Sequence, residues 1–245
     1  MKKILIAGAT SAIARGFARA AAERGDALYL VGRSEPRLNE TAADLKVRGA
    51  SSVGTCVMDL RETARHAALI DAAEKDMSGL DMVLLAHGTL TDQAAAEQDV
   101  ALLDREIATN FTSAATLMTL VANRFEQKRA GSIGVITSVA GDRGRQSNYV
   151  YGASKAALIA FTSGLRGRLA RSGVSVTDIR PGFVDTPMTA NVKKNALFAQ
   201  PDAVGRTIYN AMQKQKDVIY VPGFWRFIMM AIKTVPEPIF KQLKF

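Results

Sequence analysis

Residues 3–14 read KILIAGATSAIA, and the rest of the chain repeats the pattern that they begin. The apolar run Lys3–Ala7 ends in a turn that contains Gly8, which is typical of a buried parallel strand. Ser11–Gly25 then spaces its apolar residues as one face of a helix, and the final glycine ends that helix. The stretch therefore predicts a strand, a tight turn and a helix.

The same alternation continues as far as residue 182. Apolar runs predict five further strands, at Ala27–Val31, Ser52–Met58, Met82–Ala86, Ser132–Thr137 and Val174–Ile179. Helices are expected between them at Glu35–Arg48, Thr63–Lys75, Gln98–Phe125 and Val150–Arg171. Strict alternation with nearly continuous apolar strands indicates a parallel sheet with helices on both faces. We predict a doubly wound α/β Rossmann fold, one domain over residues 1–245 with an apolar and basic C-terminal segment at 221–245.

Composition excludes several classes of function. The 245 residues are 48% hydrophobic and 22% charged, as in soluble globular proteins, and no run reaches the ~18 apolar residues of a membrane span. The single cysteine, Cys56, allows no internal disulfide, and with only two histidines in the chain we expect no metal site. The net charge of +9 suits a phosphorylated cofactor or substrate, or an anionic lipid surface. No block of basic residues interleaved with aromatic ones appears in the body of the chain, so we expect no nucleic-acid partner. The single cysteine indicates a reducing compartment, so we expect a cytoplasmic location.

Tyr151 and Lys155 lie four residues apart in the last predicted helix, so their side chains project from one face. A lysine ammonium beside a phenol lowers the pKa of the tyrosine, which can then exchange a proton near neutral pH. Ser138, before a turn that contains Gly141, offers a hydroxyl to the same reacting oxygen. The alternative is a surface helix that carries Tyr and Lys at a common spacing.

Doubly wound sheets bind ligands at the carboxyl ends of their strands. The candidate chemical residues fall at these ends: Gly8, Asp59, Gly88, Ser138 and Pro181. The turn at Gly8–Ala14 lies where a dinucleotide pyrophosphate meets a helix N-terminus. Of the three glycines in the usual fingerprint only Gly8 is present, with Ala12 and Ala14 at the other places. Alanine still permits close approach of the backbone, although an ordinary tight turn is the alternative.

The residue after the second strand indicates which nicotinamide cofactor fits. An acidic residue at this place binds ribose hydroxyls and favours NAD, whereas an arginine pairs with a 2′-phosphate. Arg33 therefore predicts that NADP(H) is preferred over NAD(H), with Ser34 as a second contact. A solvated arginine on a loop is the alternative.

Four other polar residues are open to two interpretations or lie beside the predicted site. Asp59 either accepts a hydrogen bond from an adenine amino group or caps the helix that follows. Asn110, within an apolar helix, has either a structural or a catalytic role. We expect His66 to be solvated on a helix face, and His87 to form part of the cofactor wall rather than to act as an acid or base.

With these residues in order, the chain resembles the short-chain dehydrogenase/reductase family over essentially its whole length. The matching features are the Gly8 turn, Asp59–Leu60, Gly88, Asn110, Ser138, Tyr151 with Lys155, and Pro181–Gly182 with Thr186. The resemblance implies a catalytic set in which Tyr151 protonates the carbonyl oxygen and Ser138 bonds to it. It also implies that Lys155 binds the nicotinamide ribose and lowers the pKa of Tyr151, that Asn110 holds a relay water, and that Thr186 contacts the carboxamide.

The cofactor-binding positions come from the residues and the resemblance together. They are Gly8, Thr10, Ser11, Ala12, Ile13, Arg33, Ser34, Asp59, Leu60, Ala86, His87, Gly88, Pro181, Gly182, Val184 and Thr186.

Within the family, the second half resembles the decaprenylphosphoryl-β-D-erythro-pentofuranosid-2-ulose reductases. The similar stretches are Ala140–Arg143, Asn148–Gly152, Arg226–Met230 and Pro238–Lys241. Such enzymes reduce a 2-keto pentose on a polyprenyl phosphate and complete an epimerisation that a flavin oxidase begins. The resemblance implies this substrate class and a flavin-dependent oxidase as a partner, and the family implies a homodimer or homotetramer.

The segment Phe224–Lys233 is very apolar and too short to span a bilayer. Its aromatic and Met residues, flanked by basic residues as far as Lys244, suit an interfacial segment on anionic lipid, which would make the protein peripheral on the inner membrane face. The alternative is a helix packed on the substrate cleft or a subunit interface. The two interpretations are compatible, because a polyprenyl substrate needs an apolar approach.

Taken together, the sequence predicts an NADPH-dependent carbonyl reductase of a keto sugar on a polyprenyl phosphate. The runner-up is a reductase of small or acyl-carrier-linked ketones. A third hypothesis is a protein without catalytic activity, an NADP-binding scaffold or sensor. Such a protein would not need Ser138, Tyr151 and Lys155 together.

Overall fold

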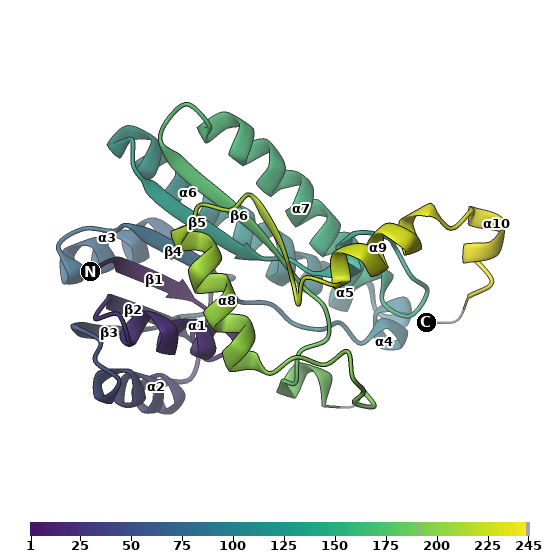
Figure 1. The fold of residues 1–245 in the computed structure, drawn as a ribbon, viewed down its shortest axis with the longest axis horizontal. Coiled ribbons are helices and arrows are strands. Elements are labelled where there is room, and N and C mark those ends of the chain that lie inside the picture. Colours follow the sequence, from purple (N-terminus) through teal and green to yellow (C-terminus); the bar gives the residue numbers. More distant parts are fainter. Residues whose placement is uncertain (191, 244–245) are drawn as a thin grey trace.

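One parallel sheet of seven strands organises the protein (Figure 1). The computed structural model describes residues 1–190 and 192–243. The strands are β1 (Lys3–Ala7), β2 (Ala27–Gly32), β3 (Ser52–Val57), β4 (Met82–Leu85), β5 (Gly131–Ile136), β6 (Val174–Pro181) and β7 (Val218–Val221). Their order across the sheet is β3-β2-β1-β4-β5-β6-β7. The six predicted strands are confirmed, with ends shifted by at most two residues. Strand β7 was not predicted, because its four residues are mostly half-buried or exposed at the sheet edge and form no long apolar run.

Ten α-helices are present in the described part of the chain. They are α1 (Ala12–Ala22), α2 (Glu35–Val47), α3 (His66–Met77), α4 (Gln93–Gln98), α5 (Val100–Ile107), α6 (Ser113–Lys128), α7 (Tyr149–Leu169), α8 (Pro201–Gln213), α9 (Trp225–Thr234) and α10 (Glu237–Phe240). Short 3-10 turns lie at η1 (Thr63–Arg65), η3 (Val139–Gly141) and η4 (Pro187–Thr189), and a π-helical turn, η2, at Ala108–Thr112.

The continuous helix predicted at Gln98–Phe125 is wrong. Asp99 has extended backbone angles, and its carboxylate accepts a hydrogen bond from the N–H of Ala101 at 2.9 Å. An aspartate that bonds to nearby backbone in this way starts a new helix instead of continuing the old one. The helix that begins at Val100 is then interrupted by the π-helical turn before α6.

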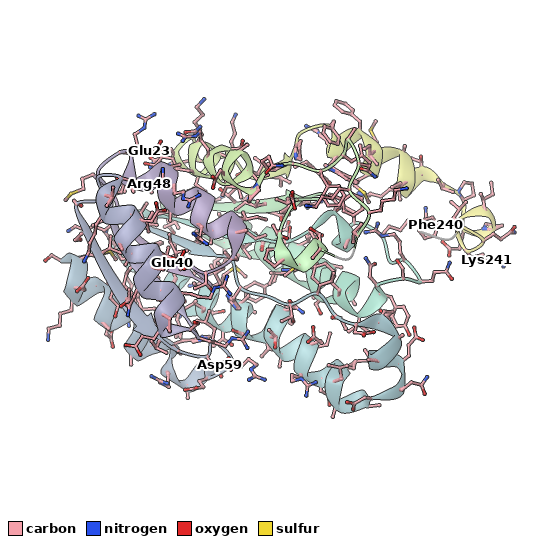
Figure 2. All side chains as sticks on the ribbon, turned by 90° about the horizontal axis from the view of Figure 1, so that it is seen from below. Glu23, Glu40, Arg48, Asp59, Phe240 and Lys241 are labelled. Atoms are coloured by element: carbon pink, nitrogen blue, oxygen red, sulfur yellow. The ribbon has the colours of Figure 1, made fainter. Side chains whose placement is uncertain are left out.

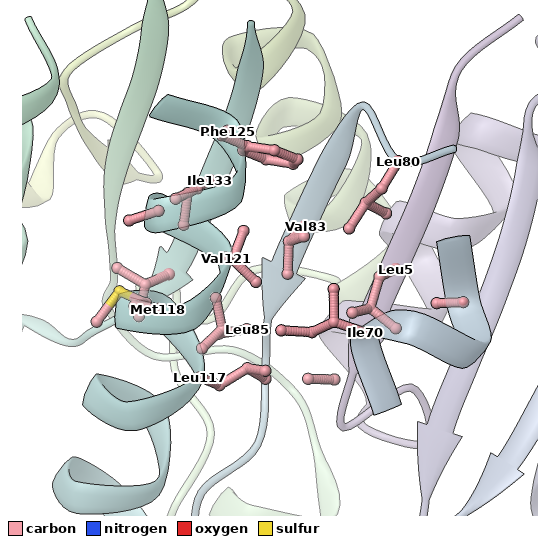
Figure 3. Packing of buried hydrophobic residues seen from close by; sticks show 14 of the residues in the cluster. Leu5, Ile70, Leu80, Val83, Leu85, Leu117, Met118, Val121, Phe125 and Ile133 are labelled. Carbon is pink, nitrogen blue, oxygen red and sulfur yellow. The ribbon is translucent and has the colours of Figure 1, made fainter. Parts of the chain in front are cut away.

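Two layers of helices cover the sheet, as the strand pattern predicted. Helices α3, α6 and α7 bury side chains against one face, where Leu5 and Val83 point into the same cluster (Figure 3). Helices α1, α2 and α8 cover the opposite face, where Ile4 and Ile6 are fully buried. Between β1 and β4 the strand order reverses direction, so the loops at their carboxyl ends diverge and leave room for a ligand.

The C-terminal helices extend beyond this three-layered body (Figure 1). Phe240 and Lys241 project at one end of the molecule, away from Glu23 and Arg48 at the other end (Figure 2). In the part of the chain that the structure describes, no helix is both long and apolar enough to cross a membrane. The predicted basic residue Lys244 lies outside the described residues.

Candidate active site

A cleft of about 880 Å³ opens at the carboxyl ends of the strands. Nearly all the predicted site residues line it: Gly8, Thr10, Ser11, Ala12, Ile13, Arg33, Asp59, Leu60, Ala86, His87, Gly88, Ser138, Tyr151, Lys155, Pro181, Gly182, Val184 and Thr186. Two predicted residues lie outside its lining. Ser34 occupies the N-cap position of α2, and Asn110 is buried behind the cleft wall. The fold thus brings segments from the whole chain to one place.

The turn after β1 passes very close to the loop after β4. Gly8 has a positive φ of +86°, and a Cβ atom there would lie 2.6 Å from the backbone nitrogen of His87. Only glycine tolerates both conditions. Ser11 caps α1, since its hydroxyl oxygen accepts a hydrogen bond from the N–H of Ala14 at 3.2 Å. The start of α1 therefore faces the cleft with the partial positive charge and free N–H groups that bind phosphate.

Four arginines line the same end of the cleft, and three of them were not predicted from the sequence: Arg15, Arg33, Arg37 and Arg61. Arg33 is exposed after β2, and the Arg37 guanidinium donates a hydrogen bond to the Thr10 carbonyl oxygen at 3.0 Å. Sequence reasoning missed the other arginines because they lie on α1, on α2 and in a loop, outside the motifs. Their signal was the basic net charge. This arginine wall suits a phosphorylated ligand.

Asp59 forms a bidentate pair with Arg61. Its carboxylate accepts hydrogen bonds from the Arg61 guanidinium at 2.7 Å and from the Arg61 backbone N–H at 2.9 Å. The Arg61 hydrogen bond lowers the pKa of Asp59 to about 2, so the carboxylate stays ionised. The alternative that Asp59 caps a helix is wrong, because the helical segment begins at Thr63 with Glu62 in the cap position.

Both histidines are held neutral. The prediction that His66 is solvated is wrong: its side chain is 0% exposed, and Nε2–H donates to the Leu60 carbonyl oxygen at 2.8 Å. The helix α3 begins at His66 and packs this side towards the sheet, and burial lowers the pKa of the imidazole. Ser113 donates its hydroxyl to the same Leu60 oxygen at 2.6 Å, so His87 Nε2–H donates to Ser113 Oγ at 3.0 Å. Burial, assisted by the Lys155 charge, lowers the pKa of His87 to about 3, which suits a neutral wall residue.

Ser138, Tyr151 and Lys155 meet where β5 ends beside α7. Ser138 stands at the start of η3, and its Oγ accepts a hydrogen bond from the N–H of Ala140 at 3.0 Å. A Cβ atom on Gly141 would lie 2.7 Å from the Lys155 carbonyl carbon, so this turn packs directly on α7. Lys155 is 3% exposed and its Nζ donates to the Ile136 carbonyl oxygen at 2.9 Å.

The electrostatics of this trio differ from the sequence-based expectation. Burial raises the pKa of Tyr151, and the Ser138 hydrogen bond only partly opposes the increase. The ammonium of Lys155 bonds to the Ile136 carbonyl oxygen, and burial lowers its own pKa to about 8, against the charge of Asp178. In the protein alone, Tyr151 therefore keeps its proton at neutral pH.

Asn110 has the contacts expected of a residue with a structural role. It is 1% exposed within the π-helical turn, and its Oδ1 accepts a hydrogen bond from the N–H of Thr89 at 2.9 Å. Its Nδ2 donates to Glu106 Oε2 at 3.3 Å, and Thr89 and Thr91 donate to that same oxygen. The side chain thus joins the loop after β4 to the helix that follows it, while the relay water stays a prediction.

Helix α9 packs against the cleft through Trp225, as the packed interpretation of the C-terminal segment predicted. Trp225 and Met229 are buried against Val139, and the Trp225 ring meets Phe183 edge-on at a centroid distance of 5.3 Å. Gly182 lies beneath the indole with no room for a Cβ atom. Sequence reasoning did not single out Trp225 as a cleft residue, although an aromatic residue at the start of an apolar helix was a signal.

Comparisons with known proteins agree with this geometry. The model of the family described as short chain dehydrogenase matches residues 2–197. An uncharacterized oxidoreductase of Mycobacterium tuberculosis is 32% identical to this protein, in an alignment that covers 98% of this chain and 96% of the relative's chain. Sulfoacetaldehyde reductase 2 of Chromohalobacter salexigens is 36% identical, in an alignment that covers 83% of this chain and 80% of the relative's chain. The structure of the actinorhodin polyketide ketoreductase with NADPH superposes with a TM-score of 0.80 at 24% identity, covering 91% of this chain and 97% of that one.

Proposed function

The chain belongs to the short-chain dehydrogenase/reductase family, and from that premise we propose that it is an NADPH-dependent carbonyl reductase. The observation that carries this proposal is the convergence of Ser138, Tyr151 and Lys155 in the cleft whose other end holds the Gly8 turn and the arginine wall. A bound nicotinamide cofactor would supply the hydride. The residues fit such a cofactor, because the Gly8 backbone approaches closely and α1 begins at the cleft.

Tyr151 serves as the proton donor in this proposal. Its raised pKa keeps the phenol protonated at neutral pH, which favours the direction of carbonyl reduction. Ser138 donates a hydrogen bond to the carbonyl oxygen and orients it towards the phenol. Lys155, whose pKa is about 8 and whose Nζ now bonds to Ile136, would hold the ribose of the cofactor. Its positive charge would stabilise the phenolate that remains when Tyr151 gives its proton to the carbonyl oxygen. Asn110 holds the neighbouring loop, and any relay water, in place.

A preference for NADPH over NADH rests on the arginine wall. Of the acidic residues in the cleft, Asp59 lies nearest this wall and is already neutralised by Arg61. A 2′-phosphate beside Arg33 would gain charge-assisted bonds, whereas a free ribose hydroxyl would find no free carboxylate. Arg33→Ala should raise the KM for NADPH by roughly tenfold with little change for NADH. Equal effects on the two cofactors would contradict the preference.

We place a keto sugar on a polyprenyl phosphate first among the substrates, with a flavin-dependent oxidase as the partner that supplies it. Support comes from the resemblance in the tail and from the apolar surface of α9 beside the cleft. A small charged carbonyl is the second candidate, favoured by the relative that is named a sulfoacetaldehyde reductase. Acyl-carrier-linked ketones belong to the same second group.

Oxidation of NADPH with a panel of these carbonyls separates the functions. Wild type should turn over at least one class, and Tyr151→Phe should lose about a hundredfold or more of that rate. Because the substitution removes a single oxygen, NADPH binding should be retained. A wild type as inactive as the variant on every carbonyl would favour the scaffold or sensor.

Contact with an anionic membrane surface is a further part of the proposal. Phe227 and Met230 of α9 are 67% and 60% exposed, while Trp225 and Met229 on the other face are buried. Deleting the segment would therefore unfold the cleft wall. The sharper test is Phe227→Ser with Met230→Ser, which should abolish sedimentation with vesicles containing phosphatidylglycerol and leave NADPH binding unchanged. Light scattering on the same samples would test the proposed homodimer or homotetramer.

A further inference from the structure

Arg145 is a half-buried cation in the wall of the cleft that the proposed mechanism does not use. It lies in the loop between η3 and α7, and it lines the cleft with Tyr151 and Trp225. Its Nε is inaccessible to solvent and has no hydrogen-bond partner among residues 1–190 and 192–243. Burial lowers the pKa of this guanidinium, although Asp142 opposes the change. A buried N–H group without an acceptor is costly, so a partner for it is to be expected.

Within the described residues, no side chain supplies that partner. Asp142 is the nearby acid, but its two carboxylate oxygens accept hydrogen bonds from Arg180 at 2.7 Å and from the Tyr220 hydroxyl at 2.9 Å. The neighbouring Arg143 shows the contrast, because its guanidinium donates to the Ile232 carbonyl oxygen at 2.7 Å and to Glu237 at 2.8 Å. Arg143 thus holds α9 and α10 in place, while Arg145 lines the cleft.

The remaining charges in the cleft leave Arg145 without an acid. The cleft lining contains two carboxylates, and both are engaged. Asp59 pairs with Arg61, and Glu106 accepts hydrogen bonds from Thr89, Thr91 and Asn110. Two more polar atoms on the substrate side are buried and unpaired in the described structure, the Oδ1 of Asn148 and the Nε1 of Trp225. The charge of Arg145 is therefore not balanced by a free acid of the cleft lining.

We propose that Arg145 binds an oxyanion of the substrate, a phosphate, sulfonate or carboxylate group, and thereby selects anionic carbonyl compounds. The planar guanidinium suits such groups because it can form two parallel bonds to their oxygens. The proposal rests on the proposed reductase function for the identity of its ligand as a substrate.

Arg145 also borders a second, smaller cavity of about 300 Å³, which Tyr149, Phe240 and Lys241 help to line. An anionic group at Arg145 would thus lie between the catalytic trio and the C-terminal helices. A compound with an apolar chain beyond its phosphate can extend along this cavity to the exposed side chain of Leu243, which also lines it. The Arg145 guanidinium can form the same charge-assisted hydrogen bonds with the phosphate of a lipid as with a small anion.

Binding is measured by the fluorescence of Trp225, the single tryptophan of the chain, with NADP⁺ at saturation so that the arginine wall is already occupied. The probes are methyl phosphate, ethanesulfonate, acetate and farnesyl phosphate, and the background is Tyr151→Phe, which cannot turn over. Arg145→Gln should raise the Kd of at least one anion by about tenfold or more, and Arg145→Lys should restore part of the affinity. Arg105→Gln is the matched control, because it removes an equal charge from an exposed position of the same cleft.

The outcomes separate this proposal from the proposed function. Loss of anion binding in Arg145→Gln but not in Arg105→Gln supports the site, even when no carbonyl is reduced. Absence of saturable binding in wild type, or equal losses in the two variants, overturns it. If farnesyl phosphate binds more tightly than methyl phosphate, the anionic group belongs to a lipid-linked substrate. If methyl phosphate binds more tightly, the anionic group belongs to a small substrate. With active carbonyls, Arg145→Gln should raise the KM of acetoacetate but not that of its uncharged methyl ester.

Discussion

The ammonium nitrogen of Lys155 lies 5.6 Å from the centre of the Tyr151 ring, one helical turn away, yet its hydrogen bond goes to the carbonyl oxygen of Ile136. The lysine therefore anchors α7 to the end of β5 in the protein alone. Its burial lowers its pKa to about 8, and this shift has a measurable consequence for stability.

Between about pH 8 and about pH 10.5 the unfolded chain keeps a proton on Lys155 that the folded chain has lost. The free energy of unfolding therefore rises with pH in this window. Relative to Lys155→Met, wild type should gain about 2 kcal/mol between about pH 7 and about pH 9.5. Urea denaturation of the two proteins at both pH values measures the difference. A difference that stays constant would show that the ammonium is solvated.

The two histidines should not titrate near neutral pH. The pKa of His87 is lowered to about 3 and that of His66 is lowered by burial, so both imidazoles stay neutral in the folded protein. Because the unfolded chain takes up these protons below about pH 6.5, acidification should destabilise the fold. Ring chemical shifts followed by NMR from about pH 8 to about pH 5.5 check this, with His87→Gln for assignment. A midpoint near 6.5 for either ring would refute it.

Gly182 and Gly167 should respond in opposite ways to alanine. A Cβ atom at Gly182 would overlap the Trp225 indole, so Gly182→Ala should cost about 1–3 kcal/mol and shift the fluorescence of Trp225 to longer wavelengths. Gly167 lies on the exposed face of α7 with open space around it, so Gly167→Ala should stabilise the protein by about 0.5–1 kcal/mol. Thermal and urea denaturation of both variants measure these changes. A neutral Gly182→Ala would mean that α9 does not pack as described.

Arg180 holds together two carboxylates near the cleft. It donates to Asp178 at 2.8 Å and to Asp142 at 2.7 Å, and the Asp178 and Asp142 side chains are each only 2% exposed. Arg180→Met leaves both acids without their cation, which should cost about 3–5 kcal/mol in the free energy of unfolding.

The matched control for that variant is Arg206→Met. Arg206 pairs with Glu23 on the surface, and both side chains are largely exposed. This loss should cost at most about 1 kcal/mol. Equal effects of the two substitutions in urea denaturation would argue against a special role for the buried network.

The order of the first six strands, and of the helices between them apart from the break at Asp99, was predictable from the sequence, because buried parallel strands carry continuous apolar runs and Gly8 marks the first turn. The cleft followed from the same order, since parallel strands place their carboxyl ends at one edge. Local signals of this kind depend on neighbours along the chain. They also assigned Ser138, Tyr151 and Lys155 to one site before any contact was known.

Only the tertiary structure decided the properties that depend on distant neighbours. Burial of His66, the bond from Lys155 to Ile136 and the raised pKa of Tyr151 arise because other segments exclude water from those side chains. Strand β7 joins the sheet edge although its residues form no long apolar run. Arg145 and Arg143 are two residues apart and look alike in sequence. Helices α9 and α10, far along the chain, supply the partners of Arg143, whereas the Nε of Arg145 has no partner among the described residues.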